Sequence, residues 1–317
     1  MHRLKRFSPQ KLVLWELLIT GFVFTSCMGG MRHPTLNPSS APPKSLVTVD
    51  GATLDKILLE EGNEVYLQTI DLHKMQIDQL VGEVAGEGSK GLYYPSKNDE
   101  SSPFFKRLTV TAVRDLYQKQ HPSGIFSIIN ASFFEDYKSS TRLSFPIKVK
   151  GVLITTGSSP YGPIQEPADP YYQTIQLKAL TWDNEKAIIS SYDPVTGYPL
   201  NQPSVQNGVV SYAYPDHPAY VLADDPINRY HVIGILNGDD AGKGNRLLIA
   251  TANRTTLQHA AEVLRQRGVT GDIMTIDGGI STYLWSAKLG NLILPQAAEG
   301  EKVPALPHYF GIRSKNK

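Results

Sequence analysis

The stretch Met274-Thr-Ile-Asp-Gly-Gly-Ile-Ser-Thr-Tyr-Leu-Trp285 sets one carboxylate beside two glycines and two hydroxyls at the end of an apolar segment. Residues 273 to 276 predict a buried strand, because three of the four side chains are large and apolar. The residues after Asp277 supply permissive backbone angles and short hydrogen-bonding groups; they include Gly278, Gly279, Ser281 and Thr282. Two interpretations stay open: a tight turn that Asp277 caps, or a strand that delivers Asp277 into a ligand site.

A strand-helix-strand unit leads into this stretch. Residues 246 to 252 are strand-like, and residues 256 to 267 predict a helix with Thr255 as its cap and one apolar face. A glycine ends that helix, and the following strand ends at Asp277. In sheets built from such units, ligands collect beyond the carboxyl ends of the strands. This favours a functional role for Asp277 and places Arg254, which follows the first strand, at the same sheet edge.

The folded part, residues 47 to 317, is expected to be one α+β domain with a mixed β-sheet core, a few flanking helices and long Pro/Gly-rich loops. Val65 to Leu72 alternates like a half-buried strand, and Met75 to Val84 is expected to return beside it as a hairpin. Phe105 to Gln120 predicts a second helix. Three proline-rich loops are expected to line a site, because structureless stretches of this length are uncommon in compact domains; they cover residues 157–172, 193–203 and 214–228.

The composition restricts the classes of function. The chain has 317 residues, of which 41% are hydrophobic and 19% are charged, so it can bury a full core. A net charge of +1, without a basic stripe in the folded part, provides no electrostatic basis for binding nucleic acid. The eight histidines lack the paired spacing of a zinc helix. The sequence therefore predicts no nucleic-acid partner, no metal and no cofactor.

The first 27 residues have the order of an export signal: basic residues, the apolar run Leu12 to Phe24, and then Thr25-Ser26-Cys27. Cys27 is the single cysteine, which excludes an intrachain disulfide. The segment resembles a bacterial lipoprotein signal, in which the cysteine is lipidated. A signal that is uncleaved or cleaved elsewhere, and a cytosolic chain, are the alternatives. Residues 28 to 46 predict a disordered tether, so we expect an envelope protein that is lipid-anchored at a membrane or secreted.

Polar side chains mark the ends of two other predicted strands. One buried strand breaks at Asn130, whose amide can both donate and accept hydrogen bonds. Another strand begins near Arg229 and ends in an Asn-Gly-Asp-Asp turn that contains Asp239 and Asp240. Because this turn is a strong hairpin signal, its two carboxylates are either turn residues or part of a site.

Taken in order, these motifs resemble the phosphodiester glycosidase family over roughly residues 60 to 313. The matching segments are Asn130-Ala-Ser-Phe-Phe134, Arg229-Tyr-His-Val-Ile-Gly234, Asn253-Arg254 and Ile276-Asp-Gly-Gly-Ile-Ser281. The chain departs from the family pattern at Ala131, Ser132 and Ile280, where the family has glycines, and at Asn253, where it has an acid.

The resemblance implies an extracytoplasmic hydrolase that cleaves a sugar from a sugar-phosphodiester in envelope polysaccharide or glycolipid. The leaving phosphate is already a stabilised anion, so the site needs a carboxylate at the anomeric carbon and cations at the phosphate more than a strong acid. Asp277 fits the first need, and Arg229 and Arg254 fit the second. Asn130 and Ser281 are expected to orient the sugar or water. Further substrate contacts are expected from Gly278, Gly279, Thr282, Asp239 and Asp240.

Two alternatives remain: a non-catalytic glycan-binding lipoprotein, which the departures from the family pattern motivate, and a glycosidase acting on bonds without phosphate. Ser-His-Asp hydrolysis is disfavoured, because Gly-x-Ser-x-Gly is absent and no histidine lies near Ser281 in sequence. Asp239, Asp240 and Asp277 would hold a hard cation only if they converge in space.

Overall fold

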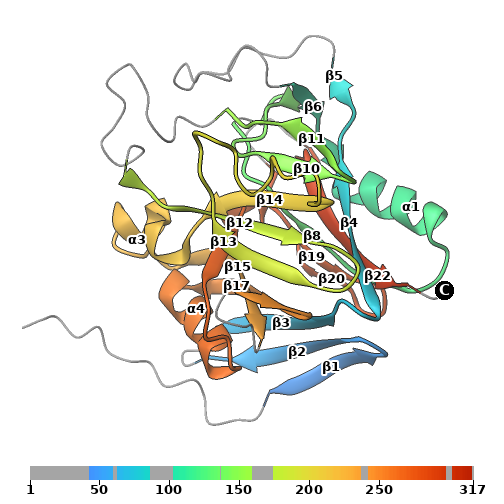
Figure 1. The fold of residues 1–317 in the computed structure, drawn as a ribbon. Coiled ribbons are helices and arrows are strands. Elements are labelled where there is room, and N and C mark those ends of the chain that lie inside the picture. The colour runs from blue at the N-terminus through green and yellow to red at the C-terminus, as the bar shows by residue number, and fades with distance from the viewer. Residues whose placement is uncertain are drawn as a thin grey trace, which may run out of the picture. The chain divides into compact units, whose positions relative to one another are not determined.

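In the computed structural model, the strand that ends beside Asp277 lies at one edge of a six-stranded sheet, called here the Asp277 sheet. Its strand order is β1-β2-β3-β17-β15-β18, and every neighbouring pair is antiparallel (Figure 1). The strands are β1 (Lys44–Val49), β2 (Ala52–Leu58), β3 (Glu64–Asp71), β15 (Asn228–Leu236), β17 (Arg246–Thr255) and β18 (Ile273–Ile276). β15 lies between β17 and β18 and is antiparallel to both. Those two strands therefore run parallel, and their C-terminal ends lie on the same side of the sheet.

The structure describes residues 43–59, 63–85, 103–135, 137–158, 174–236, 242–297 and 302–315. The predicted signal with Cys27, most of the predicted tether, and the turn residues Asp239 and Asp240 lie outside these ranges. β1 begins at Lys44, so the last residues of the range expected to be a tether belong to a strand.

Two further large sheets share a core with the first. The Asn130 sheet has the order β20-β19-β8-β22-β4 and a third sheet has the order β11-β10-β14-β12-β13-β16. The Asn130 sheet contains β4 (Met75–Val81), β8 (Ile125–Asn130), β19 (Leu284–Ser286), β20 (Gly290–Ile293) and β22 (His308–Ser314). The third sheet contains β10 (Ile147–Val149), β11 (Val152–Thr155), β12 (Leu177–Trp182), β13 (Ala187–Ser191), β14 (Asn207–Tyr212) and β16 (Lys243–Gly244). One buried cluster joins them, for example through Ile249, Phe310 and Leu180.

Short strand pairs and few helices complete the described part. The short strands are β5 (Val84–Ala85), β6 (Phe104–Lys106), β7 (Leu108–Thr109), β9 (Ser140–Thr141) and β21 (Ala305–Leu306). The helices are α1 (Val110–Gln120), α3 (Pro218–Val221) and α4 (Leu257–Gln266), with 3-10 turns η2 (Tyr214–Asp216) and η3 (Gly279–Ser281). α4 packs its apolar face on the Asp277 sheet, and α1 packs on the Asn130 sheet (Figure 1). Each helix therefore shields the sheet face that points away from the shared core.

The expected α+β class is wrong, because the described residues are mostly strand, at 49%, against 14% helix. Long helices form only where the sequence has a 3.6-residue apolar period, and most other apolar segments alternate and pair as antiparallel strands. The predicted helix from residue 105 begins later, at Val110, because Thr109 caps it by accepting a hydrogen bond from the Ala112 N–H. The strand-helix-strand unit predicted to end at Asp277 is confirmed as β17, α4 and β18. Its helix is capped by Thr256, not by Thr255 as predicted.

The hairpin expected from residues 65 to 84 is also wrong. β3 pairs with β2 and β17 in the Asp277 sheet, whereas β4 pairs with β22 in the Asn130 sheet. A three-residue turn after Asp71 carries the chain from one sheet to the next. Both strands still contribute apolar side chains to the shared core, for example Ile70 and Ile77, so burial is satisfied without direct pairing.

Candidate functional site

The ends of two strands from different sheets meet at Asp277. β18 ends at Ile276, β8 ends at Asn130, and the backbone N–H of Asp277 donates to the carbonyl oxygen of Ala131 at 2.8 Å. Register places Ile276 opposite His231 of β15, so β15 starts at the same edge. Three segments that are far apart in the sequence therefore place polar residues around one carboxyl group.

The Asn130 amide connects these segments through hydrogen bonds on both its polar atoms. Its Nδ2 donates to the Asp277 carbonyl oxygen at 2.8 Å and to Asp277 Oδ2 at 3.3 Å. Its Oδ1 accepts from the backbone N–H of Tyr283 at 2.8 Å and lies 2.7 Å from His231 Nε2. Because a backbone N–H can only donate, this contact fixes Oδ1 as the acceptor and therefore fixes the orientation of the amide.

That orientation determines the protonation of His231, which is fully buried on β15. With Asn130 Oδ1 as an acceptor, His231 Nε2 must carry the proton. Burial lowers the pKa of His231 to about 3, so the ring is neutral and Nδ1 accepts. The Thr251 hydroxyl, 2.9 Å from Nδ1, is then the donor. The chain Thr251, His231, Asn130, Asp277 thus has one consistent direction of hydrogen bonding.

Burial dominates the electrostatics of Asp277, whose residue surface is 7% exposed. Burial raises the pKa of Asp277 from 3.8 to about 8, although hydrogen bonds from Ser281, Asn130 and the Gly278 backbone pull this pKa downward. Within the ranges that the structure describes, no cation forms an ion pair with it. At neutral pH the carboxyl group therefore holds its proton in the free protein, close to the pH at which proton transfer is useful.

The glycines and hydroxyls after Asp277 shape the turn around it. A Cβ atom at Gly278 would lie 2.8 Å from the Arg229 carbonyl oxygen, so this position requires a glycine for close backbone approach. Gly279 has φ of +62°, which also favours glycine. The Ser281 Oγ lies 2.9 Å from the hydroxyl of Tyr137, and the Thr282 hydroxyl donates to the Gly279 carbonyl oxygen at 2.9 Å.

The two arginines predicted to bind phosphate lie in different surroundings. Arg229, at the start of β15, is partly buried, and its Nη1 donates to the Leu294 carbonyl oxygen at 2.9 Å. Arg254 is exposed and has φ of +60°, at the point where the β15–β17 register shifts. It lies on the same edge as Asp277 but two strands away, which corresponds to roughly 10 Å of backbone separation. The structure thus brings Asn130, Asp277 and Ser281 together, places the Arg229 backbone against Gly278, and sets Arg254 apart.

Sequence reasoning missed several members of this polar cluster. His231 shares a strand face with Arg229 through the two-residue period, and this spacing was the available signal. Tyr137 and Thr251 carried no local signal, because only the fold brings them close. A second buried pair follows Asn130 directly: Ser132 Oγ lies 2.8 Å from Nδ1 of His308, and burial lowers the pKa of that histidine to about 3.

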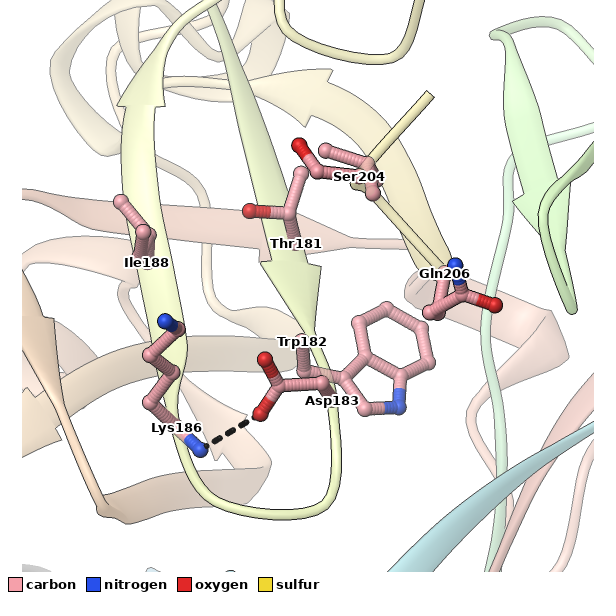
Figure 2. A pocket seen from close by; sticks show the side chains of 8 residues that line it. Thr181, Trp182, Asp183, Lys186, Ile188, Ser204 and Gln206 are labelled. Carbon is pink, nitrogen blue, oxygen red and sulfur yellow. Dashed lines mark hydrogen bonds between the residues drawn. The ribbon is translucent and has the colours of Figure 1, made fainter. Parts of the chain in front are cut away.

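Two cavities lie away from these residues. Figure 2 shows a cavity of about 180 Å³ at the β12–β13 turn, where the Lys186 backbone N–H donates to Asp183 Oδ1 at 3.0 Å. A cavity of about 230 Å³ lies beside Asp78 and Arg313, between the edge strand β4 and α1. Neither is lined by a predicted site residue. Within the described ranges, none of the helices combines the length and apolar content that crossing a membrane requires.

Comparison with known proteins gives likeness in structure only. No protein-family model matches the chain, and no curated protein matches it. A hypothetical protein from Synechocystis aligns over 87% of this chain with 11% identity and a TM-score of 0.45. The chain spans 64% of the length of that protein.

Two other solved structures are similar at the same level. The catalytic domain of zebrafish N-acetylglucosamine-1-phosphodiester alpha-N-acetylglucosaminidase, auto-inhibited by its pro-peptide, aligns over 87% of this chain and 85% of its own, with 12% identity and a TM-score of 0.49. A Burkholderia pseudomallei protein described as exported aligns over 82% of this chain and 74% of its own, with 12% identity and a TM-score of 0.41. These values assign no activity to the chain.

Proposed function

We propose that this protein is an extracytoplasmic hydrolase that releases a sugar from a sugar-phosphodiester. The observation that carries the proposal is Asp277, a buried carboxyl group whose pKa is raised to about 8 and whose hydrogen-bond partners Asn130 and Ser281 carry no charge. Strongly perturbed ionisable groups at strand ends are typical of catalytic sites. The motif resemblance to phosphodiester glycosidases supports the same assignment.

In the proposed reaction, Asp277 acts as a general base. Its carboxylate takes a proton from water as the water oxygen forms a bond to the anomeric carbon, and the bond between that carbon and the phosphate oxygen breaks. The electron pair leaves with the phosphate, which the Arg229 guanidinium holds. A pKa raised towards 8 makes Asp277 a stronger base than an ordinary carboxylate.

The other residues position these groups. Asn130 donates to the carboxyl group of Asp277 and is itself oriented by His231 and the Tyr283 N–H, so the carboxyl group is held from one side. Ser281 holds it from another side. Arg254 is assigned a weaker role, at the end of the substrate remote from the broken bond. Location outside the cytoplasm, with or without a lipid at Cys27, is proposed from the N-terminal sequence alone.

The experiment is an assay of free sugar released from a panel of sugar-1-phosphodiesters by the full chain. The Asp277→Asn variant keeps the shape of the side chain and removes the base, so we expect kcat/KM to fall at least roughly a hundredfold. Asp272→Asn is the matched control, because Asp272 precedes the same strand and its side chain is 48% exposed. Undiminished activity in Asp277→Asn contradicts the assignment. Saturable glycan binding without turnover by the wild type favours the non-catalytic alternative instead.

A further inference from the structure

Three aliphatic side chains are exposed where Arg229 begins its strand. Ile227 is 61% exposed, Ile280 is 40% exposed and Leu294 is 49% exposed. They come from three separate segments: the loop before β15, the turn η3, and the residues after β20. We call these three residues the apolar rim.

Main-chain hydrogen bonds connect the segments that carry the apolar rim. Arg229 Nη1 donates to the Leu294 carbonyl oxygen at 2.9 Å, and the Gln296 N–H donates to the Ile280 carbonyl oxygen at 2.8 Å. The Arg229 backbone lies against Gly278, where a Cβ atom would come within 2.8 Å of its carbonyl oxygen. These contacts bring the segments of Ile280 and Leu294 next to Arg229, and Ile227 precedes Arg229 by two residues in the chain.

Single exposed aliphatic residues are normal on protein surfaces. Three of them near one cation and one buried carboxyl group instead indicate a binding surface for an apolar group. A cation next to aliphatic side chains is complementary to an anion that carries an apolar chain. Ile280 is central to this arrangement, because it stands inside the turn that follows Asp277.

We propose that the substrate of this site is a sugar phosphodiester whose second ester group is a long alkyl chain, as in a lipid-linked sugar phosphate; this inference rests on the proposed function. In such a molecule the anomeric carbon, the phosphorus and the alkyl group follow in that order. With the anomeric carbon at Asp277 and the phosphate at Arg229, the alkyl group extends beyond Arg229 onto the rim. A second sugar in that place would meet aliphatic side chains at Ile280 and Leu294, not hydrogen-bonding groups.

The test measures binding of butyl phosphate and dodecyl phosphate to the full chain by calorimetry, at concentrations below micelle formation. For the wild type we expect dodecyl phosphate to bind roughly tenfold more tightly, because the partly exposed rim covers only part of the chain. The variant carrying Ile227→Ser, Ile280→Ser and Leu294→Ser should bind both phosphates about equally. Val152→Ser is the matched control, because Val152 is also 61% exposed but lies on β11 of the third sheet.

The outcomes separate this inference from the proposed function. Equal binding of the two phosphates by the wild type overturns the inference, and so does a chain-length preference that survives in the triple variant or disappears in Val152→Ser. Binding of neutral lipid vesicles that depends on the rim, without preference for the monomeric dodecyl phosphate, identifies a membrane-docking surface and also overturns it. A rim-dependent preference for dodecyl phosphate supports it.

Hydrolysis is measured separately, on methyl and dodecyl sugar phosphodiesters. Failure to cleave either compound contradicts the proposed function, whereas the binding experiment still tests the role of the apolar rim.

Discussion

Asp277 and Asp78 are both largely withdrawn from solvent, yet their surroundings differ in one respect. Asp78, on the edge strand β4, accepts from Arg313 Nε at 2.7 Å, the Tyr117 hydroxyl at 2.8 Å and Gln76 Nε2 at 2.7 Å. Asp277 has amide and hydroxyl donors, and burial raises its pKa to about 8. The Arg313 cation therefore stabilises Asp78 as the carboxylate of a structural ion pair. Within the described part of the chain Asp277 has no such cation, so its carboxyl group can gain or lose a proton near neutral pH.

The largest expected effect is on the pH dependence of stability. The folded-state pKa of Asp277 is raised from 3.8 to about 8, so the folded protein keeps a proton that the unfolded chain has lost. The contribution of Asp277 to stability is therefore fully present below pH 3.8 and is lost as the pH rises to about 8. We expect the unfolding free energy of Asp277→Asn to gain on that of the wild type by about 4 kcal/mol between pH 5 and pH 8.5. Urea unfolding at pH 5 and pH 8.5 measures the gain, and parallel curves for the two proteins would contradict the raised pKa.

The next effect concerns Asp78, whose substitution leaves Arg313 without its carboxylate. Both side chains are 16% exposed, so we expect Asp78→Asn to lower the unfolding free energy by about 3 kcal/mol. Activity per folded molecule should change little, because Asp78 lies outside the Asp277 cluster. Asp272→Asn should cost less, because Asp272 is 48% exposed and Lys178 keeps the Ser191 hydroxyl as a partner at 3.2 Å. A large loss of activity in folded Asp78→Asn would break the distinction between the two carboxylates.

The pH profile of catalysis sharpens the comparison further. If Asp277 is the base, kcat/KM on a sugar phosphodiester should rise about tenfold per pH unit below its pKa and level off above about 8, because the diester itself does not titrate there. The total rise from pH 6 to pH 8 is then about a hundredfold. A rate that falls over the same range would instead make the protonated carboxyl group a general acid.

The smallest effect tests the support of Asp277 by His231. Burial lowers the pKa of His231 to about 3, so its contribution to stability is present above its ordinary pKa of 6.5 and is lost as the pH falls from there to about 3. At pH 5 the wild type should have lost about 2 kcal/mol relative to His231→Gln, which has no such titration. Comparison of the two unfolding free energies at pH 7 and pH 5 checks this. Equal acid sensitivity would mean that His231 is not held neutral.

Local sequence patterns were sufficient for some elements and insufficient for others. The unit from residue 246 to Asp277 was predictable, because a cap, an apolar helix face and a glycine terminator act over a few residues. The pairing of β3 and β4 was not, because alternation shows that a strand has a buried face but not which strand lies beside it.

The residues of the candidate site also differ in whether the sequence indicated them. Asp277, Asn130 and Arg229 were proposed as site residues from the sequence, since each stands where a strand begins or ends. His231 was not proposed: its two-residue spacing from Arg229 indicated a shared strand face, but the sequence does not show that Asn130 would be its partner.

The sequence by itself determined that a strand ends at Asp277, that glycines follow it, and that Arg254 shares its sheet edge. Tertiary structure alone decided that Asn130 donates a hydrogen bond to Asp277 and that the segments of Ile280 and Leu294 lie next to Arg229. The physical reason is that strand ends and turns follow from steric preferences of neighbouring residues, whereas burial and the pKa shift that it causes depend on groups far apart in the chain.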